Sequence, residues 1–593
     1  MSMALAIARA DARRAIRSRL VWGAIVLLGA MFLPSTGTSA QPDLYSIGEY
    51  LLLLPFDLMT FSLVVVAAVG YSAVAGERVS GTVRFVLGLP ATRRDLVFGK
   101  LFSRMGVAVV ALGVILVIAN ALVFRGYGRP HFLAFWVMGG WMLVYVAVWS
   151  AVTVGYSAAF DSPYRTISAL VVTYVVFSFN FGVWGVVVRP VFALAFTGSF
   201  DAPSYETLAD APLWLRVTER LNPLVDFWQA IRWSIEFVGP GTPTGGPVPH
   251  LLGTLVFLSF GAIPLAVGLR RFDKSDLGDG TEGFRPGDQL WRQLRGVRAI
   301  LPGNGTTNAR SRASRVRLLA IADARHTLQN WVVSGALLVT LLLVGPRLWT
   351  RIDLGGIATR VQVLSDIPIL FALPILVVGI AVGHDAITGE RRAGTVRLAL
   401  GLPTTRREFL LAKLCSRVGV VVATLVPLLI FAEALVITRL GGVYPSALIA
   451  WAGWILLFAV VWTAVAVGVS AAVSSRFRSL GVVFGMYLIF SRQVGLWDPV
   501  VRPLFAFVFT GRFSADDYAT VADPPAWFGY LDHLNPFVAL DTVREGLFVA
   551  TGYGTSHADV ALPLFVYSVA VLLLFAVAAL TVGESRFDRR DLG

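Results

Sequence analysis

The sequence predicts an all-α polytopic membrane protein with twelve transmembrane helices, arranged as two six-helix repeats. Its 593 residues are 56% hydrophobic, with a mean hydropathy of +0.72, which is typical of membrane proteins. Apolar runs long enough to cross a bilayer recur along the chain, with basic segments between them. The second half also repeats motifs of the first, so that Lys413, for example, corresponds to Lys100.

The clearest repeat is a basic loop of about thirty residues between two apolar runs. It starts with Gly-Glu-Arg at 76–78 and ends near Lys100, and it returns from 389–391 to Lys413. The chain has only three lysines, and two of them occupy this same position in the two copies. We therefore expect two equivalent cytosolic loops.

The first part of each loop predicts a short amphipathic helix. In the first copy it runs from about Thr82 to Leu89, because Pro90 excludes the preceding residue from the helical region. Its apolar face comprises Val83, Val86 and Leu87, with Arg84 on another face. The matching residues of the second copy are Val396, Ala399 and Leu400, with Arg397. A short helix projecting from the membrane has little of its own chain to pack against, so we expect an exposed apolar face.

A second helix should begin directly after the proline. In each copy a threonine is followed three residues later by a carboxylate: Thr92 by Asp95, and Thr405 by Glu408. This spacing is the reciprocal capping pattern of a helix N-terminus. The capped helix should continue into the next membrane helix.

These residues resemble the typical loop of permease subunits of ABC-2 type exporters, a family that includes the nitrous-oxide-reductase accessory permeases. That loop reads Glu-basic-x-small-Gly-Thr, then an apolar helix, then Leu-x-Pro-x-Ser/Thr-Arg and a Gly/Ala-Lys. The resemblance implies a coupling helix that docks on a separate ATPase, with two such subunits binding ATP and Mg. The coupling residues would be Glu77, Val83, Arg84, Val86, Leu87, Glu390, Val396, Arg397, Ala399 and Leu400. An ordinary basic loop with a capped helix is the alternative.

Glu77 and Glu390 occupy the inner end of the second membrane helix of each half. Each lies near arginines of its own loop and of the N-terminal segment. We expect an ion pair that orients the coupling helix, and a simple surface carboxylate is the alternative.

The net charge of +14 indicates orientation in the membrane. The turn at 34–50 has no Lys or Arg, whereas the loops are rich in arginine, which predicts cytoplasmic N- and C-termini in the plasma membrane. Nucleic-acid binding is not expected, because no recognisable motif accompanies the charge. The single cysteine, Cys415, excludes an internal disulfide and a cysteine-rich metal site.

The N-terminus resembles a secretory signal, with arginines before the apolar run Leu20–Leu33. However, Ala-Asp-Ala-Arg at 10–13 returns at 322–325, before the run Trp331–Gly345, and an internal copy cannot be a signal peptide. We expect an amphipathic segment at the membrane surface, followed by the first membrane helix of each half. The other predicted spans are 51–75, 104–124, 132–158, 167–188 and 251–269, then 367–387, 418–438, 447–472, 479–497 and 560–582.

Two further repeats define the boundaries of the halves. Leu-Asn-Pro occurs at 221–223 and 534–536 in the long outer loops, where we expect short helices. Arg-Phe-Asp occurs at 271–273 and 586–588, so each half ends alike. The predicted domains are therefore a first permease repeat at 1–278, a basic cytosolic linker at 279–314 and a second permease repeat at 315–593.

No catalytic or metal-ligating constellation is evident. A Gly-x4-Gly-Lys-Ser/Thr phosphate loop is absent, so we expect no nucleotide or other cofactor on this chain. The six histidines form no ligand pattern. Asn120 and Glu433 occupy equivalent positions inside predicted spans and are candidates for a substrate pathway, with a structural or interfacial role as the alternative.

The sequence thus predicts the membrane-spanning permease of an ATP-binding cassette transporter, which the resemblance makes an exporter. Substrate would pass between the two repeats, and the chain itself would not be an enzyme. The alternative is a secondary transporter of the major facilitator type, which also has six plus six helices and a basic central linker.

Overall fold

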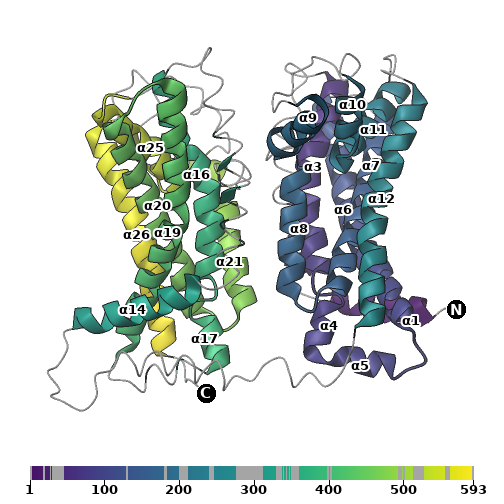
Figure 1. The fold of residues 1–593 in the computed structure, drawn as a ribbon, viewed down its shortest axis with the longest axis horizontal. Coiled ribbons are helices and arrows are strands. Elements are labelled where there is room, and N and C mark those ends of the chain that lie inside the picture. The colour runs from purple at the N-terminus through teal and green to yellow at the C-terminus, as the bar shows by residue number, and fades with distance from the viewer. Residues whose placement is uncertain are drawn as a thin grey trace. The chain divides into compact units, whose positions relative to one another are not determined.

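The computed structural model forms two compact units, Met1–Gly280 and Thr281–Gly593. Every regular element among the described residues is helical (Figure 1). The described residues are 3–17, 46–127, 131–178, 183–198, 212–239, 246–275, 312–328, 360–394, 404–491, 501–511, 526–553 and 561–589, with scattered positions in 21–32 and 335–348 and at 396, 400 and 497. The predicted linker falls almost entirely outside them.

The first unit has four long helices and several short ones. The long helices are α3 (Ile47–Gly70), α6 (Arg93–Tyr127), α7 (Phe132–Ala159) and α12 (Pro247–Lys274). The short ones are α1 (Met3–Ile16), α4 (Ala75–Ser80), α5 (Thr82–Leu87), α8 (Pro163–Phe177), the π-helical turn η1 (Trp184–Val188), α9 (Arg189–Thr197), α10 (Leu213–Arg220) and α11 (Pro223–Val238). In Figure 1, α1, α4 and α5 gather at one end of this unit and α9, α10 and α11 at the other.

The second unit repeats this order. Its long helices are α16 (Arg360–Gly383), α19 (Arg406–Leu440), α20 (Pro445–Ala472) and α26 (Leu562–Asp588). Its shorter helices are α14 (Arg312–Leu328), α17 (Thr388–Ala393), α21 (Arg476–Phe490), α22 (Arg502–Thr510), α24 (Ala526–Asp532) and α25 (Pro536–Ala550).

Eight helices among the described residues are long and apolar enough to cross a membrane, four in each unit. Of the first predicted span of each half, Leu20–Leu33 and Trp331–Gly345, the structure describes only scattered positions. The fifth spans, predicted at 167–188 and 479–497, are too long as predicted, because α8 and α21 have only 15 residues each. At 1.5 Å per residue such a helix covers about 22 Å, less than the roughly 30 Å of a bilayer core.

The predicted helix starts are confirmed. The Thr92 and Asp95 side chains cap each other's backbone, with N–H to oxygen distances of 3.0 and 3.1 Å, and Thr405 with Glu408 does the same for α19. The asparagines of the repeated Leu-Asn-Pro cap α11 and α25, as Asn222 accepts from Leu224 N at 3.0 Å and Asn535 from Phe537 N at 2.9 Å.

Helix α12 packs directly on α7 in the first unit, and α26 packs directly on α20 in the second. A Cβ built on Gly268 of α12 would lie 2.2 Å from the carbonyl oxygen of Gly155 in α7, and one on Gly583 of α26 would lie 2.5 Å from that of Gly468 in α20. Only glycine permits such close approach of two backbones. The final helix therefore runs against α7 or α20 down to the end that carries the repeated loop.

Candidate functional site: the repeated loop and its ion network

A serine of the neighbouring long helix holds the start of each loop. The Ser157 hydroxyl of α7 accepts hydrogen bonds from the backbone N–H groups of Val74 and Ala75, both at 3.1 Å. In the second unit Ser470 of α20 accepts from Ile387 and Thr388 at 3.1 and 3.2 Å. Because the first N–H groups of a helix have no partner within it, these serines fix where α4 and α17 begin.

A glycine then turns the chain after each of these short helices. Gly81 ends α4 with a φ of 75°, and Gly394 ends α17 with a φ of 72°. Chain neighbours aside, no atom of the described residues lies within 4 Å of a Cβ built on either glycine, so the left-handed backbone favours glycine there. This turn brings α5 back beneath the bundle.

The apolar face of α5 packs on its own unit, so the predicted exposure of this face is wrong. Val83 is 2% exposed and belongs to a core cluster with Leu96 of α6 and Phe272 of α12, and Val86 and Leu87 pack against that cluster. Val396 is likewise 2% exposed, with Leu400 packed against its cluster, whereas Arg397 and Ala399 lie outside the described residues. The loop folds onto its own unit, which supplies the apolar surface that the prediction assigned to a partner.

The opposite side of the loop carries the exposed apolar residues. Val79, Phe85 and Leu89 are 70%, 82% and 58% exposed, and Arg84 is exposed beside them. Phe85 and Leu89 lie between the candidate spans Ser62–Ser80 and Arg93–Tyr127. We refer to Val79, Phe85 and Leu89 as the Phe85 side of the loop.

A buried ion network joins the loop to the N-terminal helix. The Lys100 ammonium of α6 donates to Asp11 Oδ1 of α1 at 2.7 Å and to Glu77 Oε1 of α4. Arg104 completes the network, with its Nε 3.0 Å from Asp11 Oδ2. The side chains of Lys100 and Asp11 are only 4% and 3% exposed. Glu77 therefore forms the expected ion pair, but with the lysine and not with the arginines that the sequence suggested.

The second unit contains the same network. Lys413 donates to Asp323 Oδ1 at 2.6 Å and to Glu390 Oε1, and Arg417 Nη2 lies 3.4 Å from Asp323. Ser416 adds a hydrogen bond to Asp323 at 2.5 Å. The equivalent positions of the two lysines thus reflect one structural element used twice.

The network sets the charge state of its carboxylates. Burial raises the pKa of Asp11, but the positive charges of Arg104 and Lys100 outweigh burial, and the pKa lies below its usual value of 3.8. Burial and the charges of Lys413 and Arg417 act in the same way on Asp323, whose pKa is also lowered. Both carboxylates are therefore ionised at neutral pH.

Lys100 is preceded by the small residue Gly99 for a steric reason. A Cβ built on Gly99 would lie 2.8 Å from the Ala4 carbonyl oxygen and from the Ile7 side chain, both in α1. Helix α1 thus lies directly against α6 at this point. In the second copy Ala412 precedes the lysine.

The repeated Arg-Phe-Asp at the end of each unit anchors the loop, a role that was not predicted from the sequence. Phe272 is fully buried, and the guanidinium groups of Arg78 and Arg93 each lie 5.5 Å from its ring centroid. Arg93 also donates to the carbonyl oxygens of Asp273 and Ser275 at 2.9 and 2.8 Å. This arginine therefore caps the C-terminus of α12 from the start of α6.

Phe587 of the second unit has the same surroundings. Arg391 and Arg406 lie 4.7 and 5.5 Å from its ring centroid, and Arg406 donates to the carbonyl oxygens of Phe587 and Asp588 at 2.6 and 2.8 Å. The sequence signal was available, since the Arg-Phe-Asp repeat and the loop arginines were both visible, but nothing in the sequence paired them.

Asn120 and Glu433 lie on α6 and α19, well away in the chain from the loop residues, and both are partly buried. Both carboxylate oxygens of Glu433 are shielded from solvent without a hydrogen-bond partner among the described residues. Over the same residues, no group of three or more His, Cys, Asp or Glu side chains is placed to hold a metal ion.

Comparison with known families gives one result. The family model described as ABC-2 family transporter protein matches residues 5–277 and, a second time, residues 299–592. No curated protein matches the chain. The two matches cover both copies of the loop and its network.

Proposed function

The chain belongs to the ABC-2 transporter family and contains its membrane unit twice in tandem, and from this premise we propose a permease driven by two separate ATPase subunits. The family makes the chain a membrane permease of an ABC transporter, and the eight apolar helices agree with a multi-pass membrane protein. The family match also favours this function over a secondary transporter of the major facilitator type.

The observation that carries the proposal is the threefold attachment of each loop to its own bundle. Ser157 ties the loop to α7, Lys100 ties it to α1 and α6, and Phe272 ties it to α12. A loop held at three buried points cannot move without moving those helices. It is thus suited to pass a displacement at one end of the bundle into the membrane.

The Phe85 side is the surface that we assign to the ATPase. Phe85 and Leu89 are large apolar side chains outside the candidate spans, so burial in lipid does not account for their exposure. Exposed apolar surface of this kind is typical of a binding site for another protein. The buried face with Val83 instead transmits the contact to the bundle.

In this mechanism the partner subunits bind ATP and Mg and close on each other. Their closure displaces both loops, and the two units change conformation around a substrate route between them. The chain contributes no phosphate loop and hydrolyses no ATP. Export is the direction that the family resemblance suggests, with the loop end of each unit and both termini in the cytoplasm.

Asn120 and Glu433 are the residues that we assign to the substrate route. An ionisable group within a membrane helix is costly unless it faces a cavity or a polar partner. Glu433 has no such partner among the described residues, which supports a role in the route.

Replacement of Phe85 by Asp tests the ATPase contact. The change should abolish co-purification with the proposed partner ATPase, since burial of a phenylalanine is worth about 1.5–3 kcal/mol and a buried unpaired carboxylate adds a further cost. Insertion and monodispersity should be unchanged, because Phe85 is 82% exposed. The matched control is Leu213→Asp, 70% exposed at the start of α10 near the other end of the unit. Wild-type co-purification of Phe85→Asp would contradict the assignment.

A further inference from the structure

The exposed face of α12 is a continuous apolar stripe that ends in three cations. Large apolar residues along it are between 42% and 64% exposed, from Val248 near its start to Val267. These 19 steps correspond to about 29 Å along the helix axis, close to the roughly 30 Å thickness of a bilayer core. The next turns, which hold Arg270, Arg271 and Lys274, therefore lie at the depth of lipid headgroups.

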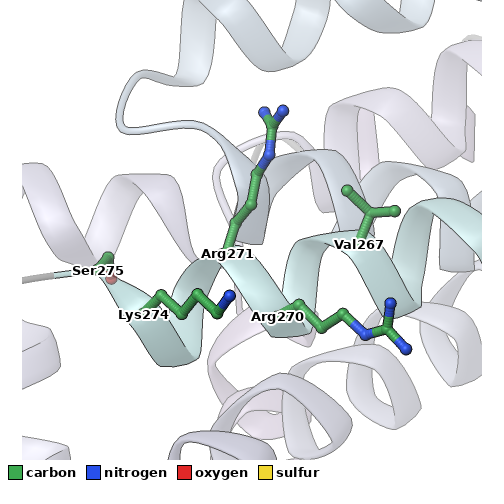
Figure 2. A pocket seen from close by; sticks show the side chains of 5 residues that line it. All are labelled: Val267, Arg270, Arg271, Lys274 and Ser275. Atoms are coloured by element: carbon green, nitrogen blue, oxygen red, sulfur yellow. The ribbon is translucent and has the colours of Figure 1, made fainter.

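The three cations line an open hollow of about 290 Å³ together with Val267 and Ser275. Figure 2 shows their side chains leaving the last turns of α12. Arg270, Arg271 and Lys274 are all exposed, and none has a hydrogen bond or ion pair with another of the described residues.

Helix capping and pairing with Asp273, two other roles that these cations could have, are performed by other residues at this end of the helix. Arg93 bonds to the last carbonyl groups of α12, so the helix C-terminus does not need them as a cap. Asp273, the nearest acidic residue in sequence, lies 3.7 Å from Arg94. Three positive charges that have no partner among the described residues, beside an apolar wall, fit a ligand that has both an anionic group and an acyl chain.

We propose that the end of α12 is a binding site for an anionic phospholipid, with its phosphate between Arg270, Arg271 and Lys274 and an acyl chain along the stripe. A soluble phosphate would use the cations but not the stripe. A neutral lipid would use the stripe but not the cations. The inference requires only that the chain spans a membrane, so its failure and the failure of the ATPase proposal are distinguishable.

The second unit supplies a natural comparison, because its last helix ends differently. At the matching positions α26 has Ser585, Arg586 and Arg589, so one cation is replaced by serine. Glu584 adds a carboxylate there, 3.8 Å from Arg407. We therefore assign the site to the first unit alone.

The test is native mass spectrometry of the delipidated full chain, titrated with phosphatidylglycerol or with phosphatidylcholine. The variant R270Q/R271Q/K274Q should bind its tightest phosphatidylglycerol about 100-fold more weakly, since each of the three basic residues near an anionic lipid surface contributes about fivefold. Phosphatidylcholine binding should not change, which also reports that the variant is folded. The control R586Q/R589Q in α26 should leave the tightest phosphatidylglycerol site intact.

A gain-of-site variant makes the test independent of any loss of folding. The change E584L/S585R gives α26 the residues of α12 at these positions and should add a second tight phosphatidylglycerol. Three results would overturn the proposal: unchanged phosphatidylglycerol binding by the triple variant, displacement of the lipid by inorganic phosphate alone, or loss of ATPase co-purification from the triple variant with lipid binding intact. The last result would make these cations part of the protein contact.

Discussion

The ammonium group of Lys100 lies 2.7 Å from Oδ1 of Asp11, although 89 residues separate them in the chain. The pair joins α1 to α6 at a point where both side chains are almost fully buried. Since Glu77 of α4 shares the same ammonium, the N-terminal helix and the loop are held by one residue. The second unit has the same relationship between Lys413 and Asp323.

Replacement of Lys100 by Met should strongly destabilise the first unit. It leaves the carboxylate of Glu77 without its cation and Asp11 with Arg104 alone, and breaking a buried ion pair in this way costs about 3–5 kcal/mol. The unfolding temperature in detergent measures the effect. As a control, Arg94→Gln removes the exposed pair with Asp273 and should cost less than about 1 kcal/mol.

The same variant distinguishes the network from simple packing. If unpaired charge is the cause, the triple variant D11N/E77Q/K100M should recover part of the lost stability, because it removes the stranded carboxylates. A triple variant no more stable than Lys100→Met alone would show that the lysine acts mainly through its packing.

The network should also make stability depend on acid pH. The pKa of Asp11 is lower in the folded chain than its usual 3.8, so its contribution is complete above that value and is lost as the pH falls through the folded pKa. The wild type should therefore lose more stability than D11N/D323N below about pH 4. Unfolding temperatures of both chains across this range measure the difference, and parallel curves would contradict the prediction.

Replacement of Phe272 by Leu should loosen the end of α12 without unfolding the bundle. Leucine keeps much of the apolar volume but removes the ring between Arg78 and Arg93, a loss of about 1–2 kcal/mol for two partly buried cation–π contacts. Hydrogen exchange of the last turn of α12 and of α5 should become faster. Phe132→Leu, at a residue 56% exposed, is the control and should leave both segments unchanged.

Much of the fold could be predicted because its signals are local. The capping pairs at Thr92 and Thr405 and the capping asparagines Asn222 and Asn535 need only residues within three positions. The long apolar helices follow from composition alone. The short helices α8 and α21 could not be distinguished from full spans, because apolar residues recur after the C-terminal end of each helix.

The site was harder to predict because its contacts are distant in the chain. In the sequence, an apolar helix face looks the same whether it packs on its own unit or on a partner protein. In the structure, Val83 packs on its own unit. Because arginines far outnumber lysines in the chain, the sequence favoured an arginine as the ion-pair partner of Glu77. In the structure the partner is Lys100. The packing of Phe272 between two loop arginines joins residues about 180 positions apart, which sequence periodicity cannot reveal.

The most direct test of the central proposal is site-specific photo-crosslinking in the complex with the ATPase. A benzophenone amino acid is placed in turn at Phe85, at the buried Val83 and at Leu213 near the other end of the first unit. We expect a covalent product with the ATPase from position 85 and none from position 83 or 213. A product from position 213, or none from position 85 while the complex hydrolyses ATP normally, would contradict the proposal.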